Sequence, residues 1–166
     1  MRSLVTGSAL LLLVLPAAAF AQQPARGDTA LAMGSFVSSR IDDKKLPVRD
    51  LVTDDRGTQY LIEFDELIVA LKANGEFRAA LRYRQTLALK GEKTTQEPVE
   101  RMTVYGTWVR DGAAIRFVPD PKRGGEGLRI LAGTHTARTI TVPFDYRNGR
   151  VQRRATVVLV FDPNII

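Results

Sequence analysis

Few residues of this sequence have the types and spacing that acid–base or metal chemistry requires. His135 is the single histidine and no cysteine is present, so a site built from several imidazole or thiolate ligands is excluded. The acidic pairs Asp42-Asp43 and Asp54-Asp55 lack the ligand spacing of a calcium loop. No serine occupies a nucleophile elbow. We interpret His135 as a solvated loop residue and both acidic pairs as solubilising loop residues, and we expect no enzyme, no metal and no cofactor.

Four aromatic residues with a polar tip carry the first functional hypothesis. They lie on the predicted inward faces of strands, at Tyr60, Tyr83, Trp108 and Tyr146. A ring with one hydrogen-bonding tip suits the wall of a small-molecule cavity. The alternative is that the four rings fill a packed core, with their tips at the end of the fold. The first hypothesis makes them the ligand-binding residues for a small hydrophobic or amphipathic molecule.

A group of arginines around one turn carries the second hypothesis. Arg147, Arg150, Arg153 and Arg154 surround the dipeptide Asn148-Gly149. Each basic residue near an anionic membrane contributes about 1 kcal/mol of binding free energy. The alternative is that these charges keep a strand edge soluble and unpaired. The second hypothesis is an envelope interaction protein whose basic surface contacts anionic lipid, polysaccharide or a partner protein.

Short runs of alternating apolar and polar residues predict the elements that position these candidates. A period of two is typical of half-buried β-strands. The segment from Asp65 to Lys90 is also rich in helix-forming residues, so a helix is the alternative there. We favour strands because alternation places Arg78, Arg82 and Arg84 on one face, whereas a helix would scatter them among apolar neighbours. The alternating runs are residues 60–64, 67–71, 77–89, 102–108, 140–146 and 157–161.

Three turn signals support this interpretation. Asn74-Gly75, Asp111-Gly112 and Asn148-Gly149 are each flanked by alternating runs. These dipeptides tolerate the positive φ angles of a type I′ turn, and they are the strongest short-range signal for a hairpin. The sequence therefore predicts hairpins that follow one another in an antiparallel meander.

The first residues have the features of a cleavable export signal. Arg2 precedes an apolar stretch from Ala9 to Phe20, and Ala19-Phe20-Ala21 fits the small-residue cleavage pattern. The stretch is shorter than the roughly 20 apolar residues of a transmembrane helix. No cysteine follows the cleavage site and no arginine pair precedes the stretch. We expect a signal peptide at residues 1–21, export by the general secretory route, and a periplasmic or secreted product.

The chain after this signal is moderately basic. It holds 23 Lys and Arg (24 minus Arg2) against 18 Asp and Glu, or a net charge of +5. Such a charge is compatible with anionic partners, but the interleaved basic and aromatic residues of RNA-binding modules are missing. The strand runs are mostly shorter than the 9–11 residues of a membrane-spanning strand. We expect no nucleic acid partner and no membrane span after signal cleavage.

The order of these hairpin signals resembles a known group of barrels. A strand, Asn74-Gly75, a long strand, a loop, Gly106-Thr107-Trp108, Asp111-Gly112 and a further strand follow one another as in exported bacterial lipocalin-like, calycin-type domains. The resemblance covers roughly Gly34 to Phe161. It implies an up-and-down β-barrel or half-barrel of about eight strands, whose interior takes one small ligand. In true lipocalins the Gly-x-Trp motif lies on the first strand, where this chain has Gly34-Ser35-Phe36.

The sequence thus predicts an all-β protein with three parts. These are the signal peptide at residues 1–21, a flexible lead-in at 22–33 and a single lipocalin-like β domain at 34–166. The expected function is that of a soluble, exported, non-enzymatic binding domain, with an interior hydrophobic ligand as the first hypothesis and an envelope surface as the second.

Overall fold

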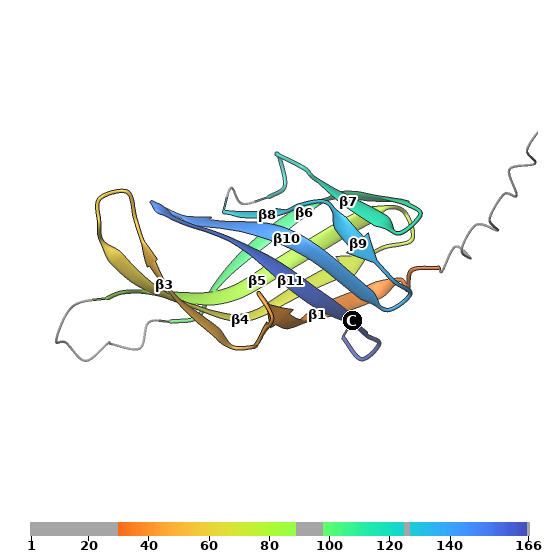
Figure 1. The fold of residues 1–166 in the computed structure, drawn as a ribbon. Helices are drawn as coiled ribbons and strands as arrows, with labels where there is room; N and C mark the ends of the chain where they lie inside the picture. The colour runs from red at the N-terminus through yellow and green to blue at the C-terminus, as the bar shows by residue number, and fades with distance from the viewer. Residues whose placement is uncertain (1–29, 89–97, 125–126, 166) are drawn as a thin grey trace, which may run out of the picture.

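The computed structural model describes residues 30–88, 98–124 and 127–165, and every regular element in these ranges is a β-strand. The signal peptide expected at residues 1–21 and most of the lead-in lie outside the described residues. Among the described residues no helix is long and apolar enough to cross a membrane. The strands (Figure 1) are β1 (Gly34–Ile41), β2 (Lys44–Lys45), β3 (Val48–Thr53), β4 (Gln59–Leu71), β5 (Glu76–Leu87), β6 (Glu100–Asp111), β7 (Ala114–Pro119), β8 (Leu128–Ile130), β9 (Gly133–His135), β10 (Thr139–Asn148) and β11 (Val151–Asp162).

The strands close into a barrel because β1 has a partner on each edge. On one edge β1 pairs with β11, with Phe36 opposite Phe161, and on the other it pairs with β4, with Gly34 opposite Leu71. The closed order is β1-β11-β10-β9-β7-β6-β5-β4 and back to β1, and all pairings are antiparallel. The predicted up-and-down barrel of eight strands is therefore confirmed.

Three short strands lie beside this closed ring. β8 pairs with the second half of β10 and β9 with its first half, so the two act as one interrupted strand. β2 forms a small hairpin with the end of β1. β3 pairs with the first half of β4, where β1 does not reach. One end of the barrel therefore has a wall made by β3 and β4 on one side and by the β10–β11 hairpin on the other.

The core is the inward face of these strands. Along β10, Ile140, Val142, Phe144 and Tyr146 are buried, while the residues between them are only half-buried. This period of two is what a strand with one face toward a core requires. The segment that also allowed a helix consists of β4 and β5 as far as Leu87, so the strand prediction is confirmed there; residues 89 and 90 lie outside the described part.

The predicted hairpin turns are present, with one difference in geometry. Gly112 and Gly149 are the first loop residues of their two-residue turns, and only the glycine has a positive φ, of 55° and 58°. A glycine at that position is the requirement of a type II′ turn. Two consecutive positive φ angles, as in a type I′ turn, occur instead at Asp42 (46°) and Asp43 (62°), between β1 and β2. This acidic pair therefore forms the tight turn itself, in which Asp43 is exposed and Asp42 is half-buried.

Ordered packing begins before the first strand. Leu31 is buried in the core, and the backbone N–H of Ala32 donates a 2.9 Å hydrogen bond to the carbonyl oxygen of Ala137. Both residues belong to the segment that the sequence predicts as a flexible lead-in. Burying the apolar side chain of Leu31 against the barrel stabilises the folded chain. The positions of Gly and Pro in residues 22–33 do not reveal this packing.

Gly106 and Gly133 are the two positions where the barrel wall leaves least space for a side chain. A Cβ atom at Gly106 would lie 2.1 Å from the carbonyl oxygen of Val118 and 2.7 Å from the ring of Phe77. Gly106→Ala should therefore destabilise the protein by about 1–3 kcal/mol, the usual cost of overpacking. Urea titrations of the wild type and the variant would measure this change in the free energy of unfolding. Ala113→Ser, in an exposed turn, is the control, and an equal loss in both variants would contradict the close packing at Gly106.

Candidate functional site

The four aromatic candidates do not form one site. Tyr60 pairs with Leu87 at the end of β5, and Tyr83 lies four residues earlier on the same strand. Trp108 lies at the other end of the barrel, where its indole N–H donates a 3.3 Å hydrogen bond to the carbonyl oxygen of Lys72. Tyr146 lies next to Tyr83, because the two rings are in contact. The structure thus brings together Tyr83 and Tyr146, places Tyr60 further along β4 opposite Leu87, and separates Trp108 from them.

At the level of Tyr83 and Tyr146 the interior is occupied by rings from opposite walls. The ring centroids of Tyr83 on β5 and Tyr146 on β10 are 4.9 Å apart, and those of Phe64 on β4 and Tyr146 are 5.4 Å apart. Both pairs are edge-to-face, the favourable arrangement for aromatic rings. Tyr83 and Tyr146 are almost completely buried. The rings therefore fill the barrel at this level and contribute to a packed core.

The hydroxyl tips of the two buried tyrosines have partners. The Tyr146 hydroxyl donates a 2.7 Å hydrogen bond to Gln85, and the Tyr83 hydroxyl donates to the carboxylate of Glu100. Burial raises the pKa of both phenols, and the Glu100 carboxylate raises that of Tyr83 further. Both phenols stay protonated at neutral pH, so neither serves as a general base.

The four arginine candidates also have separate roles. Arg153 shares the inward face of β11 with the buried Val151 and Ala155, whereas Arg154 points outward. Arg154 donates two hydrogen bonds to Asp145, of 2.6 Å and 3.1 Å. Among the described residues, the guanidinium groups of Arg147 and Arg150 form no ion pair. Only these last two are available for an external anion without breaking a contact.

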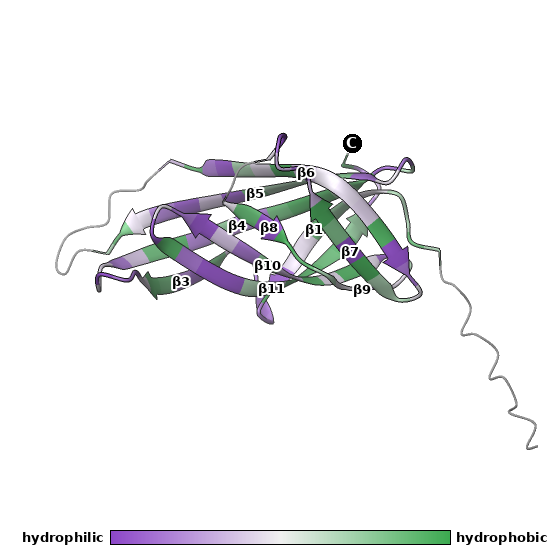
Figure 2. Cartoon of the chain, turned by 90° about the horizontal axis from the view of Figure 1, so that it is seen from above, coloured by the Kyte–Doolittle hydropathy of each residue, from purple (hydrophilic) through white to green (hydrophobic). Residues whose placement is uncertain are grey.

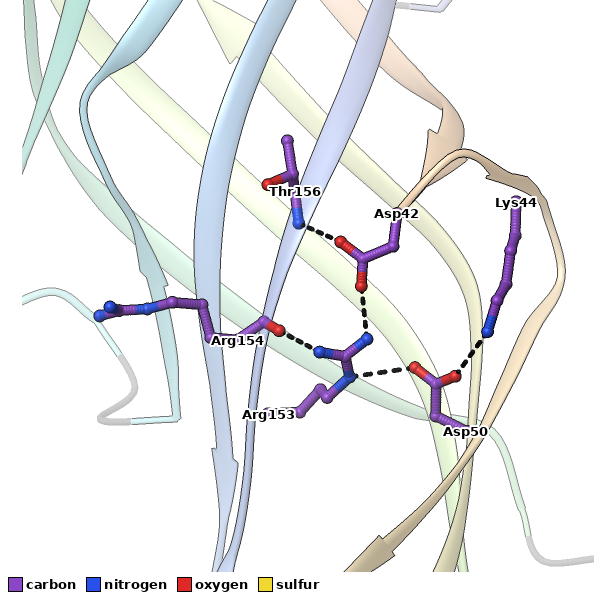
Figure 3. Close-up of polar contacts among 6 residues, drawn as sticks. All are labelled: Asp42, Lys44, Asp50, Arg153, Arg154 and Thr156. Carbon is purple, nitrogen blue, oxygen red and sulfur yellow. Dashed lines mark hydrogen bonds and ion pairs between the residues drawn. The ribbon is translucent and has the colours of Figure 1, made fainter.

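Arg153 is the centre of a network that joins three parts of the chain (Figure 3). It donates to Asp42 in the β1–β2 turn and, at 3.0 Å, to Asp50 on β3; Asp50 also accepts a 3.2 Å bond from Lys44. In the described part of the chain β3 pairs only with β4, and β11 only with β10 and β1. The Arg153 network, defined as Asp42, Lys44, Asp50 and Arg153, therefore connects β3 and β11 where no backbone ladder does.

A cleft of about 460 Å³ lies beside this network, on the β8–β10–β11 face. Its lining includes the outward side chains of Arg129 on β8, Asp145 and Arg147 on β10, and Gln152 and Arg154 on β11; Gly127, Tyr146 and Arg153 complete it. We call this cavity the arginine cleft. Figure 2 shows that the hairpin end of β10 and β11 is predominantly hydrophilic.

Sequence reasoning missed Gly127, Arg129, Asp145 and Gln152 of the cleft, and Arg129 is the only arginine among them. It lies directly opposite Asp145 across the β8–β10 ladder. The connection between the two strands is too long for the sequence to show that they pair. A signal was available in the run Leu128-Arg129-Ile130, where the two apolar residues are buried and the arginine is exposed. The guanidinium of Arg129 forms no ion pair with any described residue.

The charge at the centre of the cleft is fixed by Asp145. The hydrogen bonds from Arg154 hold the pKa of Asp145 below its ordinary value, and the charge of Arg129 lowers this pKa further. Asp145 is therefore ionised at neutral pH, and one carboxylate faces the arginines of three strands. Four guanidinium groups line the cleft; Arg154 is neutralised by Asp145 and Arg153 by its own network, which leaves Arg129 and Arg147 uncompensated among the described residues.

The histidine is not a solvated loop residue, so that interpretation is wrong. His135 is the last residue of β9 and is buried, with Nε2 2.9 Å from the carbonyl oxygen of Gly112 and Nδ1 3.2 Å from that of Thr136. The ring is held by backbone carbonyls, and no carboxylate of the described residues orients it. Within residues 30–88, 98–124 and 127–165, no three His, Cys, Asp or Glu side chains gather in a way that could hold a metal ion.

Comparisons with known proteins do not assign the chain to a family. No protein-family model matches the chain. Among curated proteins and among solved structures there is likewise no significant match. The function must therefore follow from the barrel and from the arginine cleft.

Proposed function

We propose that this protein is a non-enzymatic binding domain of the cell envelope that contacts anionic groups through the arginine cleft. The observation that carries the proposal is that Arg129 and Arg147 line one cavity of about 460 Å³ without an ion pair to any described residue. Uncompensated guanidinium groups in a concave site attract anions at long range and bind them at short range. Export by the signal at residues 1–21 would bring the domain to such a surface.

The packed interior favours the surface over the barrel lumen. A ligand between Tyr83 and Tyr146 would have to separate two rings that are 4.9 Å apart and break the bond from Tyr146 to Gln85. Uptake of a small hydrophobic molecule in the interior stays a prediction, to be tested with an apolar fluorescent probe. The arginine cleft, in contrast, is already open and needs no rearrangement of the core.

We also infer that the barrel is calycin-like. Eight strands follow one another around the ring in up-and-down order, and the first strand closes the ring against the last. This order is the one that the resemblance to exported lipocalin-like domains implies. It supports kinship in architecture, whereas the ligand chemistry proposed above follows from residues of this chain alone.

The proposal predicts binding to anionic vesicles that depends on Arg129 and Arg147. The double variant Arg129→Gln/Arg147→Gln should bind vesicles of equal parts phosphatidylglycerol and phosphatidylcholine about 30-fold more weakly at low salt, at about 1 kcal/mol for each arginine. Sedimentation with the vesicles would measure the dissociation constant. Binding should also weaken as salt screens the charges.

The matched control is Arg101→Gln/Arg116→Gln, which removes the same charge from exposed positions on β6 and β7. This variant should lose much less affinity, because its arginines lie outside the arginine cleft. An equal loss in the two double variants would move the contact away from the cleft. A wild-type protein that does not sediment with anionic vesicles even at low salt would overturn the proposed function.

A further inference from the structure

We propose that the arginine cleft recognises one phosphate group, as part of a polar phosphorylated molecule. The inference rests on the proposed function and deepens it, because it replaces a diffuse attraction to negative charge by a discrete site with a defined ligand chemistry. The two residues that bind the phosphate are Arg129 and Arg147. Asp145 and Arg154 determine how tightly it is held.

The register of three adjacent strands places these residues close together. Asp145 on β10 lies opposite Arg129 on β8 and opposite Arg154 on β11, so the three form one row across the sheet. Arg147 lies two residues further along β10, in the next row, opposite Gln152. Diagonal neighbours of this kind are about 7–8 Å apart, within reach of long side chains. The guanidinium groups of Arg129 and Arg147 can therefore both reach the same anionic group of a ligand.

The contact between Arg154 and Asp145 shows what one guanidinium does to a carboxylate. Nε of Arg154 donates to Oδ1 of Asp145 at 2.6 Å, and Nη2 donates to Oδ2 at 3.1 Å. One planar guanidinium thus engages both oxygens of a carboxylate. The guanidinium groups of Arg129 and Arg147 come from different strands, and together they can donate to an anion that has more than two oxygens. A phosphate group has this property, since its oxygens point in tetrahedral directions and can accept from both arginines.

Asp145 determines where in the cleft an anion can bind. Its pKa is held low by Arg154 and Arg129, so a negative charge remains at the centre of the row. This charge repels an anion that approaches Arg154 and leaves the side of the cleft toward Arg147 and Gly127 as the favourable position. The same charge weakens anion binding overall. Removing it should therefore strengthen binding, a direction of change that a loss of folding cannot produce.

The size and polarity of the cleft describe the rest of the ligand. A volume of about 460 Å³ lies within the range of small-molecule sites, about 300–1,000 Å³, and exceeds what one phosphate group needs. Gln152 offers an amide next to Arg147, and the lining side chains other than Tyr146 are polar. The ligand is therefore a phosphorylated polar group, such as the glycerol phosphate head of a lipid or a soluble phosphorylated polyol. The two sources share the chemistry and differ in whether an acyl chain is attached.

Titration calorimetry of the purified exported protein with glycerol 3-phosphate tests the inference, with acetate as the carboxylate comparison. We expect glycerol 3-phosphate to bind at least tenfold more tightly than acetate. Arg129→Gln and Arg147→Gln should each weaken its binding about tenfold, as the loss of a hydrogen bond to a charged group does. Asp145→Asn should strengthen it about fivefold, the effect of one charge near a surface. Arg150→Gln, adjacent to the cleft but not lining it, should change it less than twofold.

Three results would overturn the phosphate site. The first is that acetate binds as tightly as glycerol 3-phosphate, and the second is that Asp145→Asn does not bind glycerol 3-phosphate more tightly than the wild type. The third is that Arg150→Gln and Arg147→Gln lose equal affinity for it. Binding to anionic vesicles without any binding of glycerol 3-phosphate would also overturn the phosphate site, while leaving the proposed function intact. Binding of glycerol 3-phosphate with the expected variant pattern, but no binding to vesicles, would support the site. That result would identify a soluble phosphorylated molecule as the source and would overturn the membrane contact. Thermal unfolding of each variant shows whether it is folded.

Discussion

Replacing Phe64 by alanine should lower the free energy of unfolding by about 3–5 kcal/mol, the usual cost of removing a large aromatic side chain from a core. Phe64 is fully buried on β4, and its ring contacts those of Phe144 and Tyr146 on β10 at centroid distances of 5.8 Å and 5.4 Å. β4 and β10 are not neighbours in the ring. Phe64 therefore joins two separate parts of the wall through the interior, and its loss leaves a cavity that neither strand can close.

Urea titrations of the wild type and the variant would measure this effect. The midpoint should fall while the dependence of the free energy on urea stays the same, as expected for a change in stability alone. Leu51→Ala is the control, because Leu51 on β3 is 60% exposed, and an exposed substitution usually changes stability by less than about 0.5 kcal/mol. A cost below about 1 kcal/mol for Phe64→Ala would contradict the packed interior and would restore the hypothesis of a ligand inside the barrel.

The antiparallel meander of hairpins could be predicted because its signals are local. Alternation along β5 and β10 decides which side chains face inward, and a strand with a buried face keeps that register. The turn glycines Gly75, Gly112 and Gly149 punctuate the alternation at the hairpins, and each has a positive φ. Neither signal depends on contacts between distant parts of the chain. These two features predict a meander of hairpins, whereas the barrel and its count of about eight strands are implied by the resemblance to lipocalin-like domains.

The arginine cleft could not be predicted in the same way, because it depends on strand pairing. Arg129 meets Asp145 only through the register of β8 on β10, and β8 has three residues, too few for a period to be recognised. Arg153 and Arg154, which the sequence places in one basic group, both line the arginine cleft, but they have different partners. Consecutive residues of a strand point to opposite faces, so one of the two had to face inward.

Polar residues with distant hydrogen-bond partners mark a second limit of sequence reasoning. His135 and Asp42 are read as solvated because their residue types usually are. The structure supplies partners for both: the carbonyl oxygen of Gly112 for His135, and the backbone N–H of Thr156 together with Arg153 for Asp42. Such partners are 23 residues away in the first case and 114 in the second. Once hydrogen-bonded, a polar side chain can be buried, as His135 is, or half-buried, as Asp42 is, and the sequence does not show which partner it has.

Arg153→Met should destabilise the fold by roughly 2–4 kcal/mol at neutral pH, between the values for exposed and fully buried ion pairs. The Arg153 side chain is 27% exposed, and those of Asp42 and Asp50 are 32% and 13% exposed. Methionine preserves the length of the stem but leaves both carboxylates without the guanidinium. Arg154→Met is the matched control on the same strand; its side chain is 70% exposed, and the expected cost is below about 1 kcal/mol. Asp50→Asn in the Arg153→Met background should recover part of the loss.

The pH dependence of this loss distinguishes an electrostatic role of Arg153 from simple packing. Burial raises the pKa of Asp50, but the hydrogen bonds and charges of Arg153 and Lys44 outweigh it and hold this pKa below its ordinary value. A carboxyl group with a lowered pKa in the folded state stabilises the protein above its unfolded pKa of about 4 and loses that contribution as the pH falls through the folded value. The difference in unfolding free energy between the wild type and Arg153→Met should therefore be constant from pH 7 to pH 5 and shrink below about pH 4. Urea titrations at pH 7, 5, 4 and 3 would measure it. A difference that keeps its full size at pH 3 would mean that the Arg153 side chain stabilises the barrel by packing and not by its charge.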